Sequence, residues 1–167
     1  MQVLNNSDIA TLVHFNFWAD NHILATCKRI SVDEFTRLYV PDPGWASLRG
    51  ILVHTLDTED GWRSVLQALD ADEILGVDDF PTVAVLKSQW DIERAAWINY
   101  VAGLSTERFN LGNGNDARNG PKVWQTIVHV VTHGIQHRSE AAAILTGYGQ
   151  SPGDLDFDKF LKEKSEL

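Results

Sequence analysis

Two histidines with the spacing of metal ligands, His133 and His137, stand in the segment 130–138. The apolar residues around them recur every three to four positions, which predicts a helix. In an α-helix, residues four positions apart share one face and lie about 6 Å apart along the axis. Two imidazoles at that separation can converge on one metal ion. Because two ligands alone hold a metal weakly, we expect a third ligand from another part of the chain.

His129 offers an alternative pairing, because it stands one helical turn before His133. At about 100° per residue, positions 129, 133 and 137 advance by about 40° each, so the three cannot point equally at one ion. Position 137 lies closest to the apolar side that carries Ile127 and Val130, and position 129 lies farthest from it. The helical wheel therefore predicts His133 and His137 as ligands and His129 as a neighbouring or surface residue.

The third ligand is expected to be His54, which lies in the middle of another segment with a helical apolar period. Side chains from facing helices build metal sites in the cores of helical bundles. Three neutral imidazoles suit zinc, nickel, iron or copper and leave coordination positions open for water or substrate. In the alternative interpretation, each histidine is a hydrogen-bonded core or surface residue. We adopt that interpretation for His14 and His22, which we expect to be structural.

Two carboxylates follow the proposed ligands at helical spacing. Glu140 stands three residues after His137, and Asp57 stands three residues after His54. Either could accept the second N–H of a ligand imidazole or take a proton near a metal-bound water. Either is equally explained as a solvated carboxylate on a helix. The general-base glutamate of the His-Glu-x-x-His zinc-protease helix is absent, because a glycine follows the first histidine of the pair.

Length and composition limit the class of protein. The 167 residues suffice for one domain with a core and are too few for two, so we expect a single domain over 1–167. The net charge of −9 argues against a nucleic-acid partner, whose phosphates are bound by Lys and Arg. The single cysteine, Cys27, forms no internal disulfide, and the first residues lack the features of a signal peptide. No apolar run approaches the roughly 20 residues that span a bilayer, so we expect a cytoplasmic protein without membrane contact.

The elements that must position these histidines are predicted to be helices. Four long segments have apolar residues at helical spacing and are separated by residues typical of turns. They cover about residues 6–27, 45–71, 81–102 and 121–147. A short helical turn is expected at 32–35 and a last short helix at 155–161, whereas 104–120 is expected to be a loop or small hairpin. The pattern predicts an all-α fold, a four-helix bundle.

The chain resembles the DinB family, in four groups of residues spread over nearly its whole length. They are Trp18-Ala19-Asp20-Asn21, similar to a Trp-x-x-Asn segment; His54 with Asp57, Glu59 and Trp62; His133 and His137 followed by Arg138; and Leu145, Gly147, Pro152, Asp154 and Asp156. The chain departs from the family pattern at Thr132, where asparagine is common, and at Glu140, where glutamine is common. The broader superfamily includes thiol-dependent S-transferases and maleylpyruvate isomerases.

The resemblance implies an up-down-down-up four-helix bundle with a short C-terminal helix, and often a homodimer. It also implies a divalent metal site formed by His54, His133 and His137. We expect zinc or nickel first, with iron, manganese and copper as alternatives. The resemblance assigns no catalytic side chain.

Two classes of function stay open. In the first, the protein is an enzyme, a thiol-dependent S-transferase that ionises a small-molecule thiol at the metal for attack on an electrophile. Coordination makes this chemistry feasible, because a metal-bound thiol loses its proton at neutral pH. A metal-dependent hydrolase is a variant of this class. In the second class, the protein is non-catalytic, serving a stress response or an interaction, and its metal is structural or vestigial. An open coordination sphere argues against a purely structural ion.

Other candidate sites are weaker. Cys27 stands in no nucleophile motif, and a small buried residue is the simpler interpretation. The glycine- and asparagine-rich segment at 104–120 lacks the Gly-Lys-Ser/Thr of a phosphate-binding loop. The six tryptophans are expected in the core, although Trp45, Trp62 and Trp97 could line a pocket.

Overall fold

The computed structural model describes residues 5–39, 45–69, 74–112 and 120–165, and their regular structure is helical. Four long helices dominate: α1 (Asn6–Cys27), α3 (Leu48–Gln67), α4 (Val83–Ala102) and α6 (Val123–Gly147). The short helices are α2 (Val32–Thr36), the 3-10 helix η1 (Val77–Asp79), α5 (Thr106–Phe109) and α7 (Phe157–Ser165). The all-α prediction is confirmed, and so are the four long helices and the short ones at 32–35 and near the C-terminus.

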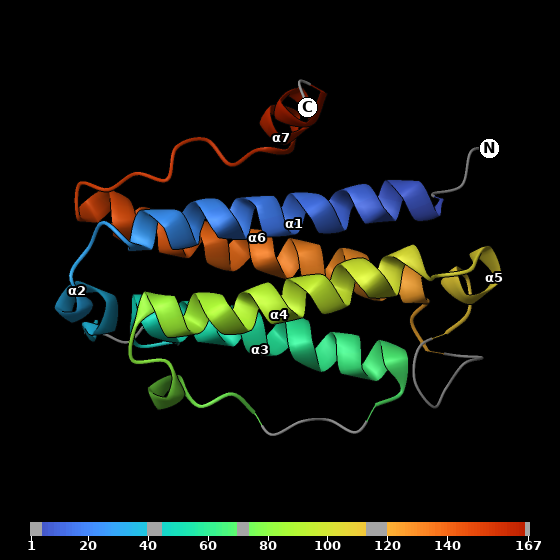
Figure 1. Ribbon diagram of the computed structural model, residues 1–167, viewed down its shortest axis with the longest axis horizontal. Helices are drawn as coiled ribbons and strands as arrows, with labels where there is room; N and C mark the ends of the chain where they lie inside the picture. The colour runs from blue at the N-terminus through green and yellow to red at the C-terminus, as the bar shows by residue number, and fades with distance from the viewer. Residues whose placement is uncertain (1–4, 40–44, 70–73, 113–119, 166–167) are drawn as a thin grey trace.

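The long helices form a bundle in which α1 and α6 run in one direction and α3 and α4 in the other (Figure 1). This is the predicted up-down-down-up arrangement. α1 packs against α4 and α6, and α3 packs against the same two helices. The neighbours around the bundle therefore follow the order α1, α6, α3, α4. As a result, the seam between α3 and α6 and the seam between α1 and α4 lie on opposite sides of the molecule.

Side-chain caps determine where α1 and α7 begin. The Asn5 side chain accepts the backbone N–H groups of Ser7 and Asp8 at 2.8 and 3.1 Å, and the Asp8 carboxylate accepts the backbone N–H of Asn5 at 3.0 Å. This reciprocal pair is a capping box, which satisfies N–H groups that the first helical turn leaves without partners. At the other end of the chain, the Asp156 carboxylate accepts the backbone N–H of Lys159 at 2.7 Å, so α7 begins later than the predicted residue 155.

α3 is shorter than predicted at both ends. Ser47 caps its first turn, and Ala46 before it has a left-handed backbone with φ of 56°, so the helix does not begin at 45. Ala68 is also left-handed, with φ of 53°, and ends the helix before the predicted residue 71. Residues 70–73 lie outside the described part of the chain. Thr82 caps α4 in the same manner as Ser47, so α4 begins at 83 rather than at 81.

The segment predicted as a loop or small hairpin contains more local structure than expected. Ser105 accepts the backbone N–H of Arg108 at 3.1 Å and so caps α5, a single helical turn. A single antiparallel bridge joins Gly112 and Lys122 in the described residues. Residues 113–119 of this segment, which include the Asn113-Gly114 step, lie outside the described residues.

The core lies between the four long helices and consists of buried apolar side chains from these helices and from shorter segments packed against them, including α2 and α5. Its largest fully buried members are Trp97, Phe35, Phe109, Ile9, Ile23, Leu24, Leu48, Ile51, Leu52, Leu56, Leu86 and Ile127. Burying one leucine or isoleucine side chain contributes roughly 1.5–3 kcal/mol, so this set is the main source of bundle stability. α7 lies outside the bundle against α1 (Figure 1), where Phe160 packs in a separate cluster with Phe15, Ala19 and Val131.

Candidate metal centre

Three histidine side chains converge at the seam between α3 and α6. Nε2 of His133 lies 3.1 Å from Nε2 of His54 and 3.2 Å from Nε2 of His137. One ring nitrogen from each histidine lies within 4.8 Å of the other two. Nitrogens bound tetrahedrally to one ion at about 2.0–2.1 Å stand about 3.3 Å apart. The cluster therefore has the dimensions of a three-nitrogen cation site and could hold a metal ion.

The positions of the α6 histidines follow the helical wheel. His137 is buried with 4% of its surface exposed, His133 is half-buried, and His129 is exposed. The ring centroid of His129 lies 5.4 Å from that of Trp62 and 6.1 Å from that of His133. The structure therefore brings together His54, His133 and His137 and leaves His129 beside the cluster at the surface, as predicted.

Glu140 orients His137. Its Oε2 lies 2.8 Å from Nδ1 of His137, the geometry of an Nδ1–H···O hydrogen bond. A proton on Nδ1 leaves Nε2 of the neutral ring with a free lone pair, and that is the nitrogen facing His133. A carboxylate in this position also raises the basicity of the ligand nitrogen.

Asp57 has the same spacing from His54 but a different partner. Its Oδ1 accepts the backbone N–H of Leu75 at 2.8 Å, which ties the connection before η1 to α3. The charge of Asp57 acts on the pKa of His54 in the raising direction, against the stronger effects that lower it. Of the two carboxylates proposed from spacing, Glu140 orients an imidazole and Asp57 holds a loop.

Two of the three histidines, His54 and His133, are held neutral. Burial lowers the pKa of His54, and His137 nearby lowers it further. Burial and the charges of His137, His54 and His129 lower the pKa of His133 to about 4. Both rings are therefore uncharged at neutral pH and present nitrogen lone pairs rather than protons to the centre of the cluster.

Trp45 forms a wall beside the cluster. Its ring is stacked on His54, with centroids 3.5 Å apart and planes 10° apart, and its centroid lies 6.2 Å from that of His137. The left-handed Ala46 turns the chain so that the carbonyl oxygen of Trp45 lies against α3 at Gly50. A Cβ at Gly50 would lie 1.9 Å from that oxygen, so this close approach requires glycine.

The other two tryptophans proposed for a pocket have different roles. Trp62 lines a cavity of about 330 Å³ together with Gln125 and His129. Because His129 stands one helical turn before His133, this cavity lies next to the histidine cluster on the same seam. Trp97 is buried in the core and donates its indole N–H to the backbone carbonyl of Glu59 at 3.1 Å. The α3/α6 seam thus carries aromatic side chains on both sides of the histidine cluster.

A buried polar network that sequence reasoning missed lies behind the cluster. Nη1 of Arg138 donates to Oδ1 of Asn16 at 2.7 Å and to Oδ1 of Asp20 at 2.8 Å. Nδ2 of Asn16 donates to Oε1 of Glu59 at 2.6 Å and to Oδ2 of Asp20 at 3.1 Å. The indole N–H of Trp90 donates to Oε2 of Glu59 at 2.8 Å. The network joins all four long helices.

This network bears on the cluster because Arg138 directly follows His137 and Glu59 shares α3 with His54. It thereby ties α3 and α6 to each other through α1, in the register at which the histidines meet. Burial raises the pKa of Glu59 well above its usual value, and the charge of Asp20 raises it further. The sequence contained a sign of this network, because the charged residues in it stand at positions that the helical apolar period predicts to be buried.

Gly134 allows the guanidinium of Arg138 to fold back along α6. A Cβ at position 134 would lie 2.6 Å from Oδ1 of Asn16 and 2.7 Å from Nη1 of Arg138. Glycine inside a helix costs about 1 kcal/mol relative to alanine, so a glycine here needs a packing reason. The network supplies that reason.

His14 and His22 do not join the cluster. His14 is exposed on α1 and lines a cavity on the opposite seam. The ring of His22 packs edge-on against Trp18, with centroids 4.6 Å apart. Cys27 is fully buried, and burial raises the pKa of its thiol to about 12, which excludes it as a nucleophile in the folded protein.

Comparison with known proteins supplies a family. A model of the DinB family matches residues 1–166 of the chain. No curated protein matches it. Across the part of the chain that the structure describes, none of the helices is long and apolar enough to cross a membrane.

Proposed function

This chain belongs to the DinB family, and on that premise we propose that it is a metalloenzyme with a divalent ion held by His54, His133 and His137. The observation that carries the proposal is the convergence of three Nε2 atoms. Nε2 of His133 lies 3.1 Å from Nε2 of His54 and 3.2 Å from Nε2 of His137. Neutral imidazoles favour borderline ions, so zinc or nickel is the expected metal, with iron, manganese and copper as alternatives. Three protein ligands leave room for a further ligand, which is typical of catalytic rather than structural zinc sites.

The activity that we propose is thiol-dependent S-transfer. A divalent ion bound by three neutral ligands keeps its full charge and lowers the pKa of a coordinated thiol. The protein's own thiol does not serve, because Cys27 is buried with a raised pKa. The thiol must therefore come from a small molecule. In the transfer, the sulfur forms a bond to an electrophilic carbon of the second substrate and displaces the leaving group on that carbon, such as chloride, while the thiol proton is released to water.

The side chains around the cluster have distinct roles in this proposal. Glu140 orients His137 through the contact of 2.8 Å at Nδ1. Trp45, stacked on His54, would shield one side of the histidine cluster from water and offer an aromatic face to a substrate. The cavity lined by Trp62 and His129 on the same seam is large enough for the apolar part of an electrophile.

The test of this activity uses the metal-loaded protein with glutathione, bacillithiol, mycothiol or coenzyme A and a chlorodinitrobenzene electrophile. One of these thiols should be transferred, and the activity should disappear in His133→Ala but persist in His22→Ala, because the His22 ring packs against Trp18 away from the cluster. Hydrolysis of nitrophenyl esters without any thiol would favour a metal-dependent hydrolase instead. Failure of both reactions in metal-loaded protein would support a non-catalytic role in a stress response or an interaction.

We also propose that the protein acts as a cytoplasmic homodimer, which the family resemblance and the single cysteine favour. Sedimentation velocity tests the assembly directly. A single species with twice the chain mass of 18.7 kDa is expected, and a monomer at all concentrations would contradict the dimer.

A further inference from the structure

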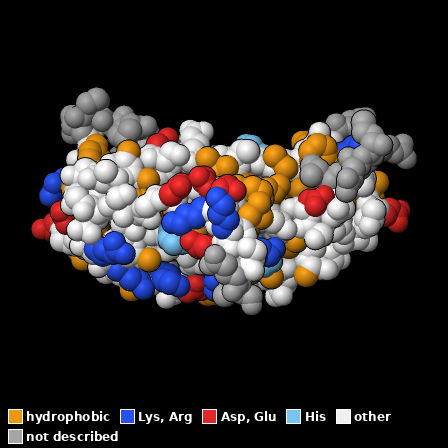
Figure 2. Space-filling view, turned by 90° about the horizontal axis from the view of Figure 1, so that it is seen from above, with side chains coloured by type: hydrophobic (Ala, Val, Ile, Leu, Met, Phe, Trp, Pro, Cys, Tyr) orange, Lys and Arg blue, Asp and Glu red, His pale blue; other side chains and the backbone are white. Residues whose placement is uncertain are grey.

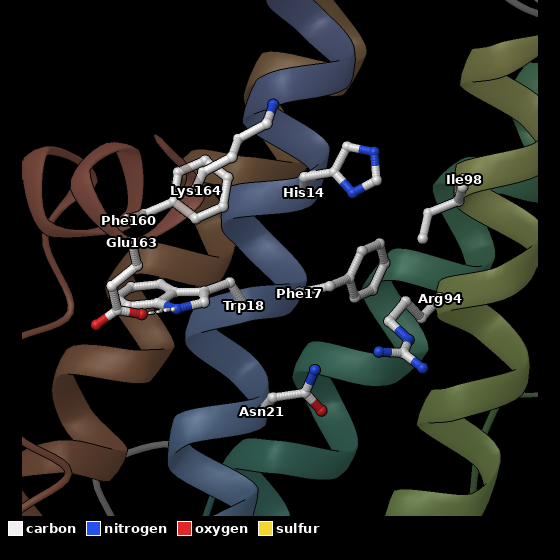
Figure 3. A pocket seen from close by; sticks show the side chains of 9 residues that line it. All are labelled: His14, Phe17, Trp18, Asn21, Arg94, Ile98, Phe160, Glu163 and Lys164. Carbon is white, nitrogen blue, oxygen red and sulfur yellow. Dashed lines mark hydrogen bonds between the residues drawn. The ribbon is translucent and has the colours of Figure 1, made fainter. Parts of the chain in front are cut away.

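The seam opposite the histidine cluster contains a cavity of about 360 Å³ between α1, α4 and α7. Cavities of about 300–1,000 Å³ with apolar walls and a few polar groups are typical of small-molecule sites. Figure 3 shows the side chains that line it, which come from all three helices. None of them belongs to the metal centre or to the buried network of Arg138.

The walls of this cavity are largely aromatic and rigid. Phe17 is only 4% exposed, and Figure 3 shows its ring between α1 and α4 at the centre of the site. Trp18 donates its indole N–H to Oε2 of Glu163 at 2.8 Å, which fixes the indole and pins α7 to α1. Phe160 packs against Trp18, with ring centroids 5.7 Å apart. A flat apolar group is therefore the shape that these walls accommodate.

Within the part of the chain that the structure describes, two hydrogen-bond donors at one end of the cavity have no strong partner. Among the described residues, Arg94 pairs with Asp91 at a long distance of 3.7 Å. The half-buried side chain of Asn21 makes no hydrogen bond within the described residues. Figure 3 shows the Arg94 guanidinium, from α4, and the Asn21 amide, from α1, turned toward each other across the gap beside Phe17. A guanidinium and an amide facing a common space are suited to bind a carboxylate.

The charge of the cavity is opposite to that of the whole chain. Arg94 and Lys164 line it, and Lys164 interacts with the ring of Phe160 at 5.9 Å. Glu163 also lines the cavity, and its carboxylate accepts the indole N–H of Trp18. Figure 2 shows basic and acidic side chains side by side at the centre of the face where α7 crosses α1, with hydrophobic side chains bordering them. The positive charge is thus local, in a chain whose net charge is −9.

We propose that this cavity is a second ligand site, separate from the metal centre, that binds a small aromatic carboxylate. The carboxylate lies between Arg94 and Asn21, and the ring lies on Phe17 and Trp18. The attraction between Arg94 and the carboxylate is charge-assisted, so a neutral ligand of the same shape binds less tightly.

The test compares 2-naphthoate with its neutral isostere, 2-naphthamide, by isothermal titration calorimetry. Naphthoate should bind with one site per chain and about tenfold more tightly than the amide, since a charge-assisted hydrogen bond is lost with the charge. Arg94→Gln should abolish that preference and leave amide binding unchanged. Lys28→Gln, which removes the same charge from the exposed end of α1 outside the cavity, should preserve it.

Because a carboxylate could instead bind a metal, the titration is repeated with His133→Ala. Unchanged naphthoate affinity in this variant is expected, and loss of binding would assign the ligand to the histidine cluster and overturn the proposal. Equal binding of naphthoate and naphthamide would also overturn it, as would equal losses in the Arg94 and Lys28 variants. If naphthoate does not bind and Ile98→Asp converts a dimer to a monomer, the face is an interface between two copies and not a ligand site.

Discussion

The carboxylate of Glu140 lies 2.8 Å from Nδ1 of His137, and the other nitrogen of the same ring faces His133 at 3.2 Å. One side chain therefore determines both the tautomer and the direction of a proposed ligand. Asp57, at the same spacing from His54, binds the backbone N–H of Leu75 instead. The contrast between these two carboxylates gives the first test of the site.

Glu140→Ala should weaken the affinity for a divalent metal roughly 10- to 100-fold, because His137 loses the acceptor that orients it. Titration with zinc and nickel against a competing chelator measures the change. Asp57→Asn is the matched control and should weaken binding far less, since its partner is a loop N–H. Equal losses in the two variants would mean that the Glu140 contact has no special role.

Gly134→Ala should lower the free energy of unfolding by roughly 2–4 kcal/mol. The new Cβ would lie 2.6–2.7 Å from Asn16 and Arg138, so it overpacks the core and displaces hydrogen bonds of a charged group. Chemical denaturation measures the change. Gly61→Ala in α3 is the control, because nothing beyond its chain neighbours and the backbone of its own helix lies within 4 Å of its Cβ position, and it should stabilise the protein by roughly 0.5–1 kcal/mol. Stabilisation by both substitutions would contradict the packing described for Arg138.

The buried carboxyl of Glu59 should make stability depend on pH. Burial and the neighbouring Asp20 raise its pKa in the folded protein, whereas the unfolded chain releases the proton near pH 4.3. The stabilisation that Glu59 contributes is therefore fully present below about pH 4 and is lost as pH rises through the folded-state pKa.

Comparison with Glu59→Gln isolates this effect from other titrating groups, including His54 and His133, whose lowered pKa values act in the opposite direction. Urea denaturation from about pH 4 to pH 8 should show wild-type stability decreasing relative to the variant as pH rises. A constant difference over that range would mean that Glu59 ionises equally in both states.

Cys27 should be unreactive in the folded protein. Its side chain is fully buried, and burial raises the pKa of the thiol to about 12. A disulfide reagent such as dithionitrobenzoate should modify Cys27 only after denaturation, at a rate set by unfolding. Rapid modification under native conditions would contradict this burial and would reopen Cys27 as a source of thiol chemistry.

Much of the fold was predictable because its determinants are local. The apolar period of the four long segments indicates which face of each helix is buried, and the wheel separates His129 from His133 and His137 on the same principle. His54 was predictable as the third member because it is a polar residue within a buried segment. Helix ends were less predictable, since the left-handed Ala46 and Ala68 have no compositional signal.

The remaining features depend on residues that are distant in sequence. Arg138 binds Asn16 and Asp20, which precede it by 122 and 118 positions, and no local pattern specifies such a pairing. The partner of Asp57 was unpredictable for the same reason. Its spacing from His54 suggests that it orients that histidine, whereas it accepts the backbone N–H of Leu75, which is distant in sequence. The stacking of Trp45 on His54 follows from a turn that brings the chain against Gly50.

The most direct test of the central claim is the metal content of protein purified without an affinity tag. Inductively coupled plasma mass spectrometry should find about one divalent ion per chain, as expected for a single three-histidine site. His54→Ala, His133→Ala and His137→Ala should each lose it, and His129→Ala should retain it. Absence of metal from the purified protein, together with no uptake of zinc or nickel by the chelator-treated chain, would contradict the metal centre.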